Sequence, residues 1–347
     1  LKIIFFSKFK VLFFNYEYSN TNFFKKRTLI ENKFNPNNKL FNFLIGNMPS
    51  DFINSILYND NNINKLFKPL NLLTFNNIFN SSFSTYCAVN SNKVKIFFGQ
   101  HGSHYGIQKN HLSEQLERRL CHKYFAYGWS NHKNITNISL PPLANKITPY
   151  DDKKKILFVT NNTSVFFLRF QSHQQPFNNF KEHFQNPVEF IRNSKLKKNI
   201  LFRNYKTSND SSFKNSERIK KIYPNLAFDN NHNIYDSFKF SKIVVLDHLG
   251  TAFFESLSLN IPTFLILDKN SNNFRDSFKI FEKKLLNKNL LFYSPISASS
   301  FINKVYKNTE LFWSDEKLQK DIKDLLNRYY PIDEHWYKNW LFKLSLK

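Results

Sequence analysis

The chain has 347 residues, a formal net charge of +24 from 50 basic and 26 acidic residues, and 18% aromatic residues. Its length allows two ordinary α/β domains, and its 41% content of hydrophobic residues excludes a disordered or collagen-like chain. Two cysteines, Cys87 and Cys121, cannot form a disulfide scaffold or a four-thiolate zinc site. We therefore expect the protein to work in a reducing compartment.

The positive charge suggests a nucleic-acid partner, but its distribution argues against one. Only 9 of the 50 basic residues are arginine, which reads phosphate and guanine better than lysine does, and the lysines are spread along the chain. Lys, Asn, Phe and Ile are abundant together, as A/T-rich codons would produce. We therefore expect no specific nucleic-acid partner. Glycine, with 6 residues, is so scarce that its positions are informative.

The sequence contains no candidate membrane span and no visible secretory signal. No segment reaches the ~18–20 consecutive apolar residues that a bilayer-spanning helix needs. The chain begins with Leu1 rather than Met, so either the start codon is unusual or an N-terminal part is missing. We expect the protein to be cytoplasmic.

The first 150 residues contain short apolar runs, and a regular pattern of strands and helices can be recognised only from about residue 90 onward. Runs at 3–6, 11–14 and 40–45 predict buried strands, and the spacing over 51–67 predicts a helix. We then predict a strand over 93–98, a helix over 112–120 and a strand over 123–127.

Beyond a connection at Pro141, Pro142 and Tyr150–Asp152, strands and helices alternate regularly. Predicted strands cover 155–160, 199–203, 242–246, 263–267 and 289–293. Predicted helices cover 177–194, 211–222, 251–259 and 274–286, followed by a helical tail over 298–347. Uninterrupted apolar strands such as Ile243–Leu246 are typical of a parallel sheet covered on both faces. We predict an α/β fold with one domain over 1–148 and a second over 149–347.

Three of the six glycines fall within Gly99–Gly106, directly after the predicted strand over 93–98. Glycines let a loop turn sharply and approach a ligand closely, and ligands bind at the carboxyl ends of strands in open α/β sheets. His101 is a candidate general base because the ordinary pKa of histidine is near neutrality. The alternative is a tight turn in which His101 only bonds to backbone. Gln100, Gly102 and Tyr105 are candidate substrate-binding residues, with Tyr105 stacking on a sugar or a base.

A second candidate site begins where the strand ending at Leu246 leads into Gly250 and Thr251. Thr251 is predicted as the N-cap of the following helix, whose unpaired N–H groups favour phosphate, and Glu255 lies one turn further on. The alternative is ordinary capping of a packing helix. Because the motif is neither a P-loop nor a G-x-G-x-x-G fingerprint, we expect no dinucleotide and no other cofactor. No carboxylate or thiolate stands at zinc spacing from His104 or His111, so we also expect no metal.

Two of the rare arginines, Arg203 and Arg275, are predicted at the same carboxyl edge of the second sheet. Two guanidiniums that converge on a helix N-terminus would suit a nucleotide phosphate. Surface ion pairs are the alternative, for instance between Arg275 and Asp276. Glu114 and Glu117, three residues apart on the helix over 112–120, predict a solvated helix face, with a catalytic carboxylate as the alternative.

The motifs resemble a family of transferases found in bacterial O-antigen gene clusters. The resemblance covers roughly 94–330 and rests on these residues: Gln100-His101-Gly102-x-x-Tyr105-Gly106, Glu117, Tyr127-Gly128-Trp129-Ser130, Pro141-Pro142-Leu143, Leu201-x-Arg203-x-Tyr205, Gly250-Thr251-x-x-x-Glu255, Asn260-Ile261-Pro262-Thr263 and Arg275. Two departures are visible. His122 stands where the family tends to have Asp. The family is also longer at the N-terminus, so the first domain could be incomplete in this chain.

The resemblance implies two Rossmann-like domains that face a cleft, the architecture called GT-B. It implies a glycosyltransferase-like enzyme that moves a sugar unit from a nucleotide-activated donor to a glycan or lipid-linked acceptor of surface polysaccharide. His101 would take the acceptor proton, and Gly250 and Thr251 would hold the donor phosphates. Arg203 and Arg275 would stabilise the leaving nucleotide, and Glu255 would accept a hydrogen bond from a ribose or sugar hydroxyl.

Other functions fit the same resemblance and stay open at this point. A sugar-nucleotide epimerase and a glycerophosphate transferase share the architecture, and a nucleotide-sugar or polyanion-binding protein is the non-enzymatic alternative. The excess of lysine leads us to expect peripheral contact with anionic membrane at its inner face.

Overall fold

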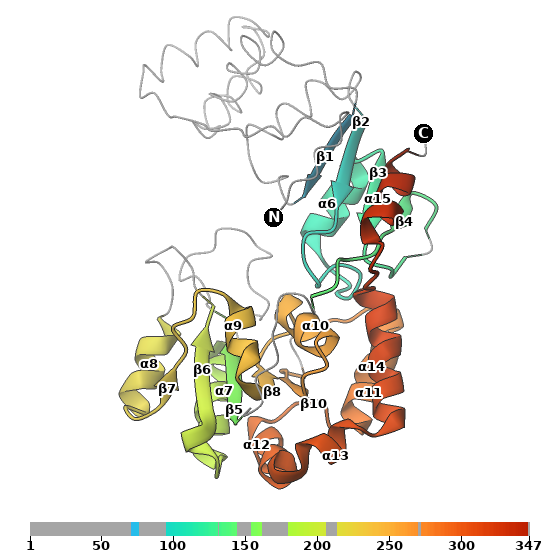
Figure 1. The fold of residues 1–347 in the computed structure, drawn as a ribbon. Coiled ribbons are helices and arrows are strands. Elements are labelled where there is room, and N and C mark those ends of the chain that lie inside the picture. The colour runs from blue at the N-terminus through green and yellow to red at the C-terminus, as the bar shows by residue number, and fades with distance from the viewer. Residues whose placement is uncertain are drawn as a thin grey trace, which may run out of the picture. The chain divides into compact units, whose positions relative to one another are not determined.

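The computed structural model describes residues 71–75, 95–130, 132–143, 154–161, 180–205, 214–269 and 272–345 (Figure 1). The strands predicted at 3–6, 11–14 and 40–45, the helix predicted over 51–67 and Cys87 lie outside these residues. No helix within the described ranges combines the length and the hydropathy that crossing a bilayer requires.

The first sheet has four parallel strands in the order β1-β2-β3-β4. They are β1 (Asn71–Phe75), β2 (Lys95–Gly99), β3 (Lys123–Ala126) and β4 (Ile135–Asn137). Helices α6 (Leu112–Leu120) and α15 (Trp336–Ser345) lie on opposite faces of β3. The Tyr124 hydroxyl bonds to Glu117 of α6, whereas the ring of the next residue, Phe125, stacks on Trp340 of α15. Successive side chains of a strand point to opposite faces, so one helix covers each side.

The second sheet has six parallel strands in the order β10-β9-β8-β5-β6-β7. They are β5 (Lys155–Thr160), β6 (Ile200–Asn204), β7 (Ala227–Phe228), β8 (Ser241–Leu246), β9 (Thr263–Ile266) and β10 (Leu291–Phe292). Counted from β5, this is the strand order of the Rossmann fold, in which the chain first builds outward in one direction and then returns to build in the other. The reversal lies between β5 and β8, where ligands of open α/β sheets bind.

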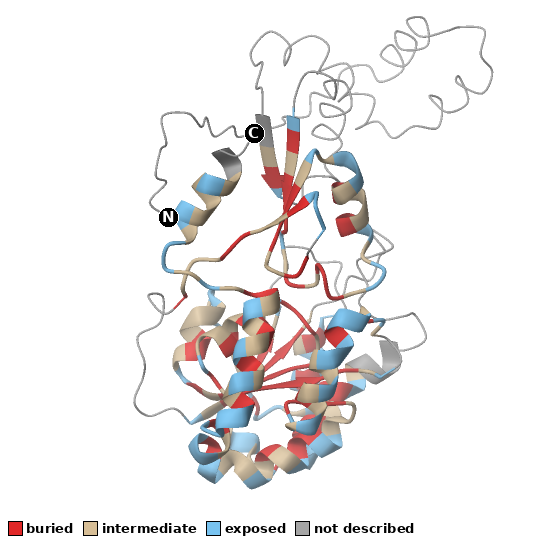
Figure 2. Ribbon diagram, turned by 90° about the vertical axis from the view of Figure 1, so that its right-hand side faces the viewer, coloured by how far each residue is buried: buried red, intermediate tan, exposed pale blue. Residues whose placement is uncertain are grey.

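Helices connect and cover these strands, and further helices follow the last one. They are α7 (Phe180–Asn193), η4 (Lys197–Asn199), α8 (Asn215–Ile222), α9 (Ile234–Lys239), α10 (Thr251–Ser258), α11 (Asp276–Asn287), α12 (Pro295–Val305), η5 (Tyr306–Asn308), α13 (Thr309–Trp313) and α14 (Glu316–Tyr329). Ile156–Phe158 of β5 and Ile243–Leu246 of β8 are fully buried. Figure 2 shows the strands of the second sheet as buried and the exposed residues gathered on the helices.

The predicted parallel α/β pattern is confirmed in the described residues, with strand and helix bounds that differ by only a few residues. The predicted strand over 155–160 is β5, and the predicted helix over 112–120 is α6. Five short elements were not predicted, namely β1, β4, η4, β7 and α9. Strands as short as β7, with two residues, carry too few side chains to show a period of two.

The helical tail returns to the first sheet. The backbone N–H of Leu140 bonds to the carbonyl oxygen of Pro331, and the Trp340 indole N–H bonds to the carbonyl oxygen of Ser139 at 2.9 Å. The tail therefore contributes to the core around β3, as well as to the packing of the second sheet.

Candidate functional site

The loop after β2 is held in shape by one buried amide side chain. Gln100 is fully buried, and its Oε1 accepts hydrogen bonds from the backbone N–H of Tyr127 at 2.9 Å and the indole N–H of Trp129 at 2.6 Å. Its Nε2 donates to the carbonyl oxygen of Gly102 at 2.8 Å. Gln100 therefore supports the loop from within, and the structure does not place it where the predicted substrate contact would require.

Tyr105 is also buried, with 3% of its surface exposed, which corrects the expectation that its ring stacks on a sugar or a base. Its hydroxyl donates to Glu117 Oε1 at 3.1 Å, and the Tyr124 hydroxyl donates to Glu117 Oε2 at 3.4 Å. Burial raises the pKa of Glu117 to about 7. Burial, followed by the Glu117 charge, raises the pKa of Tyr105 well above its ordinary value.

Glu114 is a second buried carboxylate on α6, so the solvated helix face expected for Glu114 and Glu117 is wrong. Its Oε1 accepts from Arg275 Nη2 at 2.8 Å and from Arg118 Nη1 at 3.0 Å, and its Oε2 accepts from the backbone N–H of Gly106 at 2.9 Å. Arg275 Nε donates to the carbonyl oxygen of Gln108 at 3.0 Å. Glu114 and Arg275 thus tie the loop after β2 to the segment that begins α11.

Arg275 therefore forms an ion pair with the buried Glu114, and not the surface pair with Asp276 that was considered above. Arg203 is bound by a larger number of groups within the protein. Its Nη1 donates to Asp229 Oδ2 at 2.5 Å, to Ser237 Oγ at 3.1 Å and to the carbonyl oxygen of Asn231, in a site where 7% of the residue is exposed. The two guanidiniums that were predicted to converge on the helix beginning at Thr251 are thus each bound to a carboxylate of the protein.

The two predicted loops nevertheless meet. A methyl group added at Gly102 would lie 3.8 Å from Thr251 Oγ1, and one added at Gly250 would lie 3.8 Å from His104 Cε1. His101, which precedes Gly102, is exposed. Gly250, and not Thr251 as predicted, occupies the N-cap position of α10, and because it lacks a side chain it makes no side-chain cap hydrogen bond there. The His101-Gly102 segment therefore faces a helix N-terminus that no capping side chain covers.

The contact between the loops lies at the point where the strand order of the second sheet reverses. Thr160 is the last residue of β5, and Asp247 directly follows β8. The Thr160 Oγ1 donates a hydrogen bond to Asp247 Oδ2 at 2.5 Å. Asp247 is fully buried, and His248 Nδ1 lies 3.1 Å from Asp247 Oδ1. Neither Asp247 nor His248 was predicted to have a functional role. The sequence pattern that could have identified them is an aspartate and a histidine directly after a buried strand.

Histidines from both loops gather around His104. Burial lowers the pKa of His104 to about 3, and the neighbouring His111, His248 and His101 lower it further in that order of size. His104 is therefore neutral at pH 7. Among the described residues, no group of three or more His, Cys, Asp or Glu side chains is arranged to hold a metal ion.

Glu255, predicted to bind a hydroxyl of the donor, lies on α10 and accepts a hydrogen bond from the Tyr235 hydroxyl at 2.6 Å. Burial, followed by that bond, raises the pKa of Tyr235 well above its ordinary value. A hydroxyl group is thus already bound at the position where the prediction places a ribose or sugar hydroxyl.

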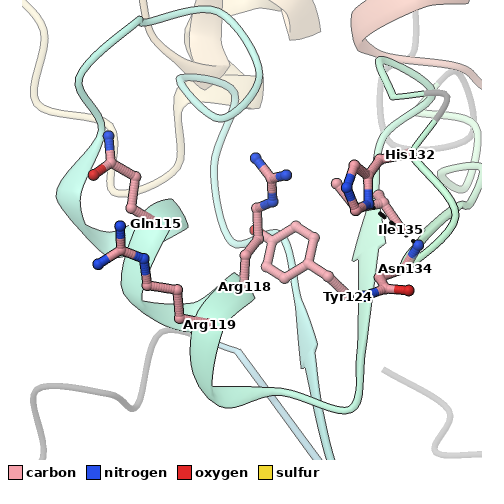
Figure 3. A pocket seen from close by; sticks show the side chains of 7 residues that line it. All are labelled: Gln115, Arg118, Arg119, Tyr124, His132, Asn134 and Ile135. Atoms are coloured by element: carbon pink, nitrogen blue, oxygen red, sulfur yellow. Dashed lines mark hydrogen bonds between the residues drawn. The ribbon is translucent and has the colours of Figure 1, made fainter.

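A separate pocket of about 290 Å³ lies on the first sheet, between α6 and the segment that leads into β4 (Figure 3). Its lining is Gln115, Arg118, Arg119, Tyr124, His132, Asn134 and Ile135. Two arginines and no carboxylate line it, but it shares no residue with the contact between the two loops.

The fold matches several solved structures at low sequence identity. A complex of Staphylococcus aureus MnaA with UDP is 14% identical, with a TM-score of 0.53 over 85% of this chain and 81% of that one. UDP-GlcNAc 2-epimerase from Neisseria meningitidis, bound to UDP-GlcNAc, is 13% identical, with a TM-score of 0.50 over 90% of this chain and 83% of that one.

A third match is a variant of S. aureus TarM in complex with fondaparinux, α-GlcNAc-glycerol and UDP. It is 13% identical, with a TM-score of 0.50, and the match covers 85% of this chain but 59% of the TarM chain. These likenesses establish the α/β architecture with parallel sheets that is called GT-B. A search of curated protein sequences finds no match.

The sequence model described as LIC12162 family transferase matches residues 3–344, nearly the whole chain. The chain belongs to the LIC12162 family of transferases.

Proposed function

We propose that this transferase moves a sugar unit from a nucleotide-activated donor to a glycan or lipid-linked acceptor of surface polysaccharide. The observation that carries the proposal is the meeting of Gly102 with Thr251 at the strand-order reversal of the second sheet. Such reversals are where nucleotides bind in open α/β sheets, and an uncovered helix N-terminus favours phosphate.

In the proposed complex, the donor phosphates lie over the N–H groups at the start of α10, beside Gly250 and Thr251. The acceptor hydroxyl approaches from the side of His101, whose imidazole removes the proton as the new bond forms. Glu255 supports the ribose or sugar hydroxyls, either by replacing its bond to Tyr235 or by sharing it. The lysine excess keeps the enzyme close to anionic membrane, where lipid-linked acceptors are found.

The first experiment is a thermal-shift panel of CMP, CDP, UDP, GDP and dTDP, because the three solved structures described above contain UDP or UDP-GlcNAc. A ligand at 100 times its Kd adds about 2.7 kcal/mol to the free energy of unfolding, which is easily measured. We expect one nucleotide to stabilise the protein clearly. If none of the five raises the melting temperature, the proposed donor site is wrong.

The second experiment tests the reaction itself with the sugar-linked form of the nucleotide that binds. We expect His101→Ala to lower the transfer rate by about two to four decades while leaving nucleotide affinity close to that of the wild type. A wild-type rate for His101→Ala would remove His101 as the general base. Conversion of the donor without any acceptor would instead identify a sugar-nucleotide epimerase.

A further inference from the structure

The departing nucleotide phosphate needs a positive or hydrogen-bonding partner as the sugar leaves it. Arg203 and Arg275, the two candidates from the sequence, are bound to Asp229 and Glu114. Beside the start of α10 lies a different group that suits the task, the imidazole of His248. The following inference rests on the proposed function and names a catalytic residue within that site.

A chain of hydrogen bonds holds the His248 imidazole in one orientation. Thr160 Oγ1 donates to one oxygen of the Asp247 carboxylate, and the other oxygen faces His248 Nδ1 at 3.1 Å. A carboxylate only accepts hydrogen bonds, so the proton between the two groups belongs to Nδ1. This leaves Nε2 on the far side of the ring. Within the part of the chain that the structure describes, Nε2 makes no hydrogen bond.

The ring lies against the glycine that begins α10. A methyl group added at Gly250 would be 3.1 Å from His248 Cδ2 and 3.4 Å from Nε2. The side chain of His248 is 12% exposed, and that of Asp247 is fully buried. Nε2 is therefore presented beside the helix N-terminus while the carboxylate that balances a charged ring is kept out of water.

We propose that His248 is the acid of the transfer reaction and donates its Nε2 proton to the departing phosphate oxygen, with Asp247 and Thr160 as positioning residues. The bond between the sugar carbon and this oxygen breaks, and its electron pair moves to the oxygen. The acceptor oxygen forms the new bond to the sugar carbon, and its proton passes to His101. After the products leave, His248 regains a proton from water and His101 releases one, so the protons balance.

The test measures how the protein binds the nucleotide selected by the panel, in its full-length form. We compare the wild type with His248→Asn and Asp247→Asn by calorimetry, and use His335→Asn, an exposed histidine before α15, as the matched control. A charge-assisted hydrogen bond is lost in His248→Asn, so we expect its Kd for the nucleotide to rise about 10- to 100-fold. Affinity for the corresponding nucleoside without phosphate should be unchanged in all four proteins.

A spectroscopic measurement on the wild type separates a catalytic role from a merely structural one. In histidine-labelled protein, the His248 ring resonance, assigned by its loss in His248→Asn, should move toward the protonated position when the nucleotide is added. The nucleoside should not move it. His101 and His104 on the facing loop and Asp247 beside the ring are the neighbouring ionisable groups, and the assignment distinguishes the histidines.

Each outcome decides the matter. Equal nucleotide affinity in the wild type and His248→Asn, with an unmoved His248 resonance, would overturn the proposal and leave the proposed function standing. If no nucleotide binds the wild type, the proposed function itself fails and this inference falls with it. Should His248→Asn fail to fold, His248→Gln removes the same imidazole and must weaken nucleotide binding in the same way.

Discussion

Glu117 illustrates at the scale of one residue how burial changes the chemistry of a side chain. On an isolated helix its carboxylate would be charged at neutral pH, but here it lies under two tyrosine hydroxyls with no exposed surface. Its pKa is raised from 4.5 to about 7, chiefly by desolvation. The carboxyl group therefore takes up a proton in the folded state at a pH where the unfolded chain has already lost it.

This shift sets the pH dependence of stability at residue 117. The folded protein binds the proton more tightly than the unfolded chain, so the contribution of Glu117 is greatest below pH 4.5 and is lost as the pH rises through about 7. We expect Glu117→Gln, which stays neutral, to be more stable than the wild type by about 2–3 kcal/mol above pH 8.

Urea unfolding of both proteins across this pH range checks the prediction, with the exposed Glu334→Gln as the control. Taking the difference between variant and wild type cancels the opposite effect of His104, whose lowered pKa reduces stability as the pH falls. A difference that does not change with pH would show that the Glu117 carboxyl is not shifted as described.

At the scale of elements, the pair of Glu114 and Arg275 joins α6 to the segment before α11. The backbone reinforces it, because the N–H of Arg275 bonds to the carbonyl oxygen of Ile107 and the N–H of Lys109 bonds to that of Asn273. The loop that carries His101 is thus positioned from two directions, by Gln100 within the first sheet and by Arg275 from the second half of the chain.

We expect Glu114→Gln and Arg275→Met each to destabilise the protein by about 1–3 kcal/mol. The first leaves the partly buried Arg275 guanidinium without its carboxylate, and the second removes one of the two arginines that pair with the buried Glu114 carboxylate. The double variant should lose clearly less than the sum, which a urea double-mutant cycle measures. Arg192→Met is the matched control, since its ion pair with Glu189 is exposed and worth less than about 1 kcal/mol. Additive losses in the double variant would contradict a direct coupling between Glu114 and Arg275.

At the scale of the whole molecule, the dominant feature is still the net charge of +24. Acidic residues number only 26 against 50 basic ones, so 24 positive charges have no acidic counterpart anywhere in the chain. Such a charge attracts anionic surfaces over about one Debye length and is screened by salt.

We therefore expect the protein to sediment with vesicles that contain anionic phospholipid at low salt and to leave them at high salt. Vesicles of zwitterionic phospholipid alone are the control and should bind none of it. Binding that does not respond to salt, or equal binding to both kinds of vesicle, would show that charge does not bring this protein to a membrane.

Much of the second sheet could be predicted from the sequence because its strands are short, apolar and regularly spaced. Ile243–Leu246 shows the pattern of a strand buried on both faces, and β8 contains these residues. The loops at Gly99–Gly106 and Gly250 were found because glycine is scarce in this chain and follows a strand at both places. The partners of the arginines could not be found in the same way. Asp229 lies 26 residues from Arg203, and Glu114 lies 161 residues from Arg275.

By itself, the sequence determined the alternation of strands and helices, the two glycine loops and the basic character of the chain, because these depend on local residue pattern and composition. Only the tertiary structure decided which side chains are buried and paired with which. Thr160 reaches Asp247, 87 residues away, because β5 and β8 are neighbours in the sheet. Because the two strands are neighbours, Thr160 orients Asp247, which in turn orients His248. The tertiary structure likewise pairs Arg203 with Asp229 and Arg275 with Glu114.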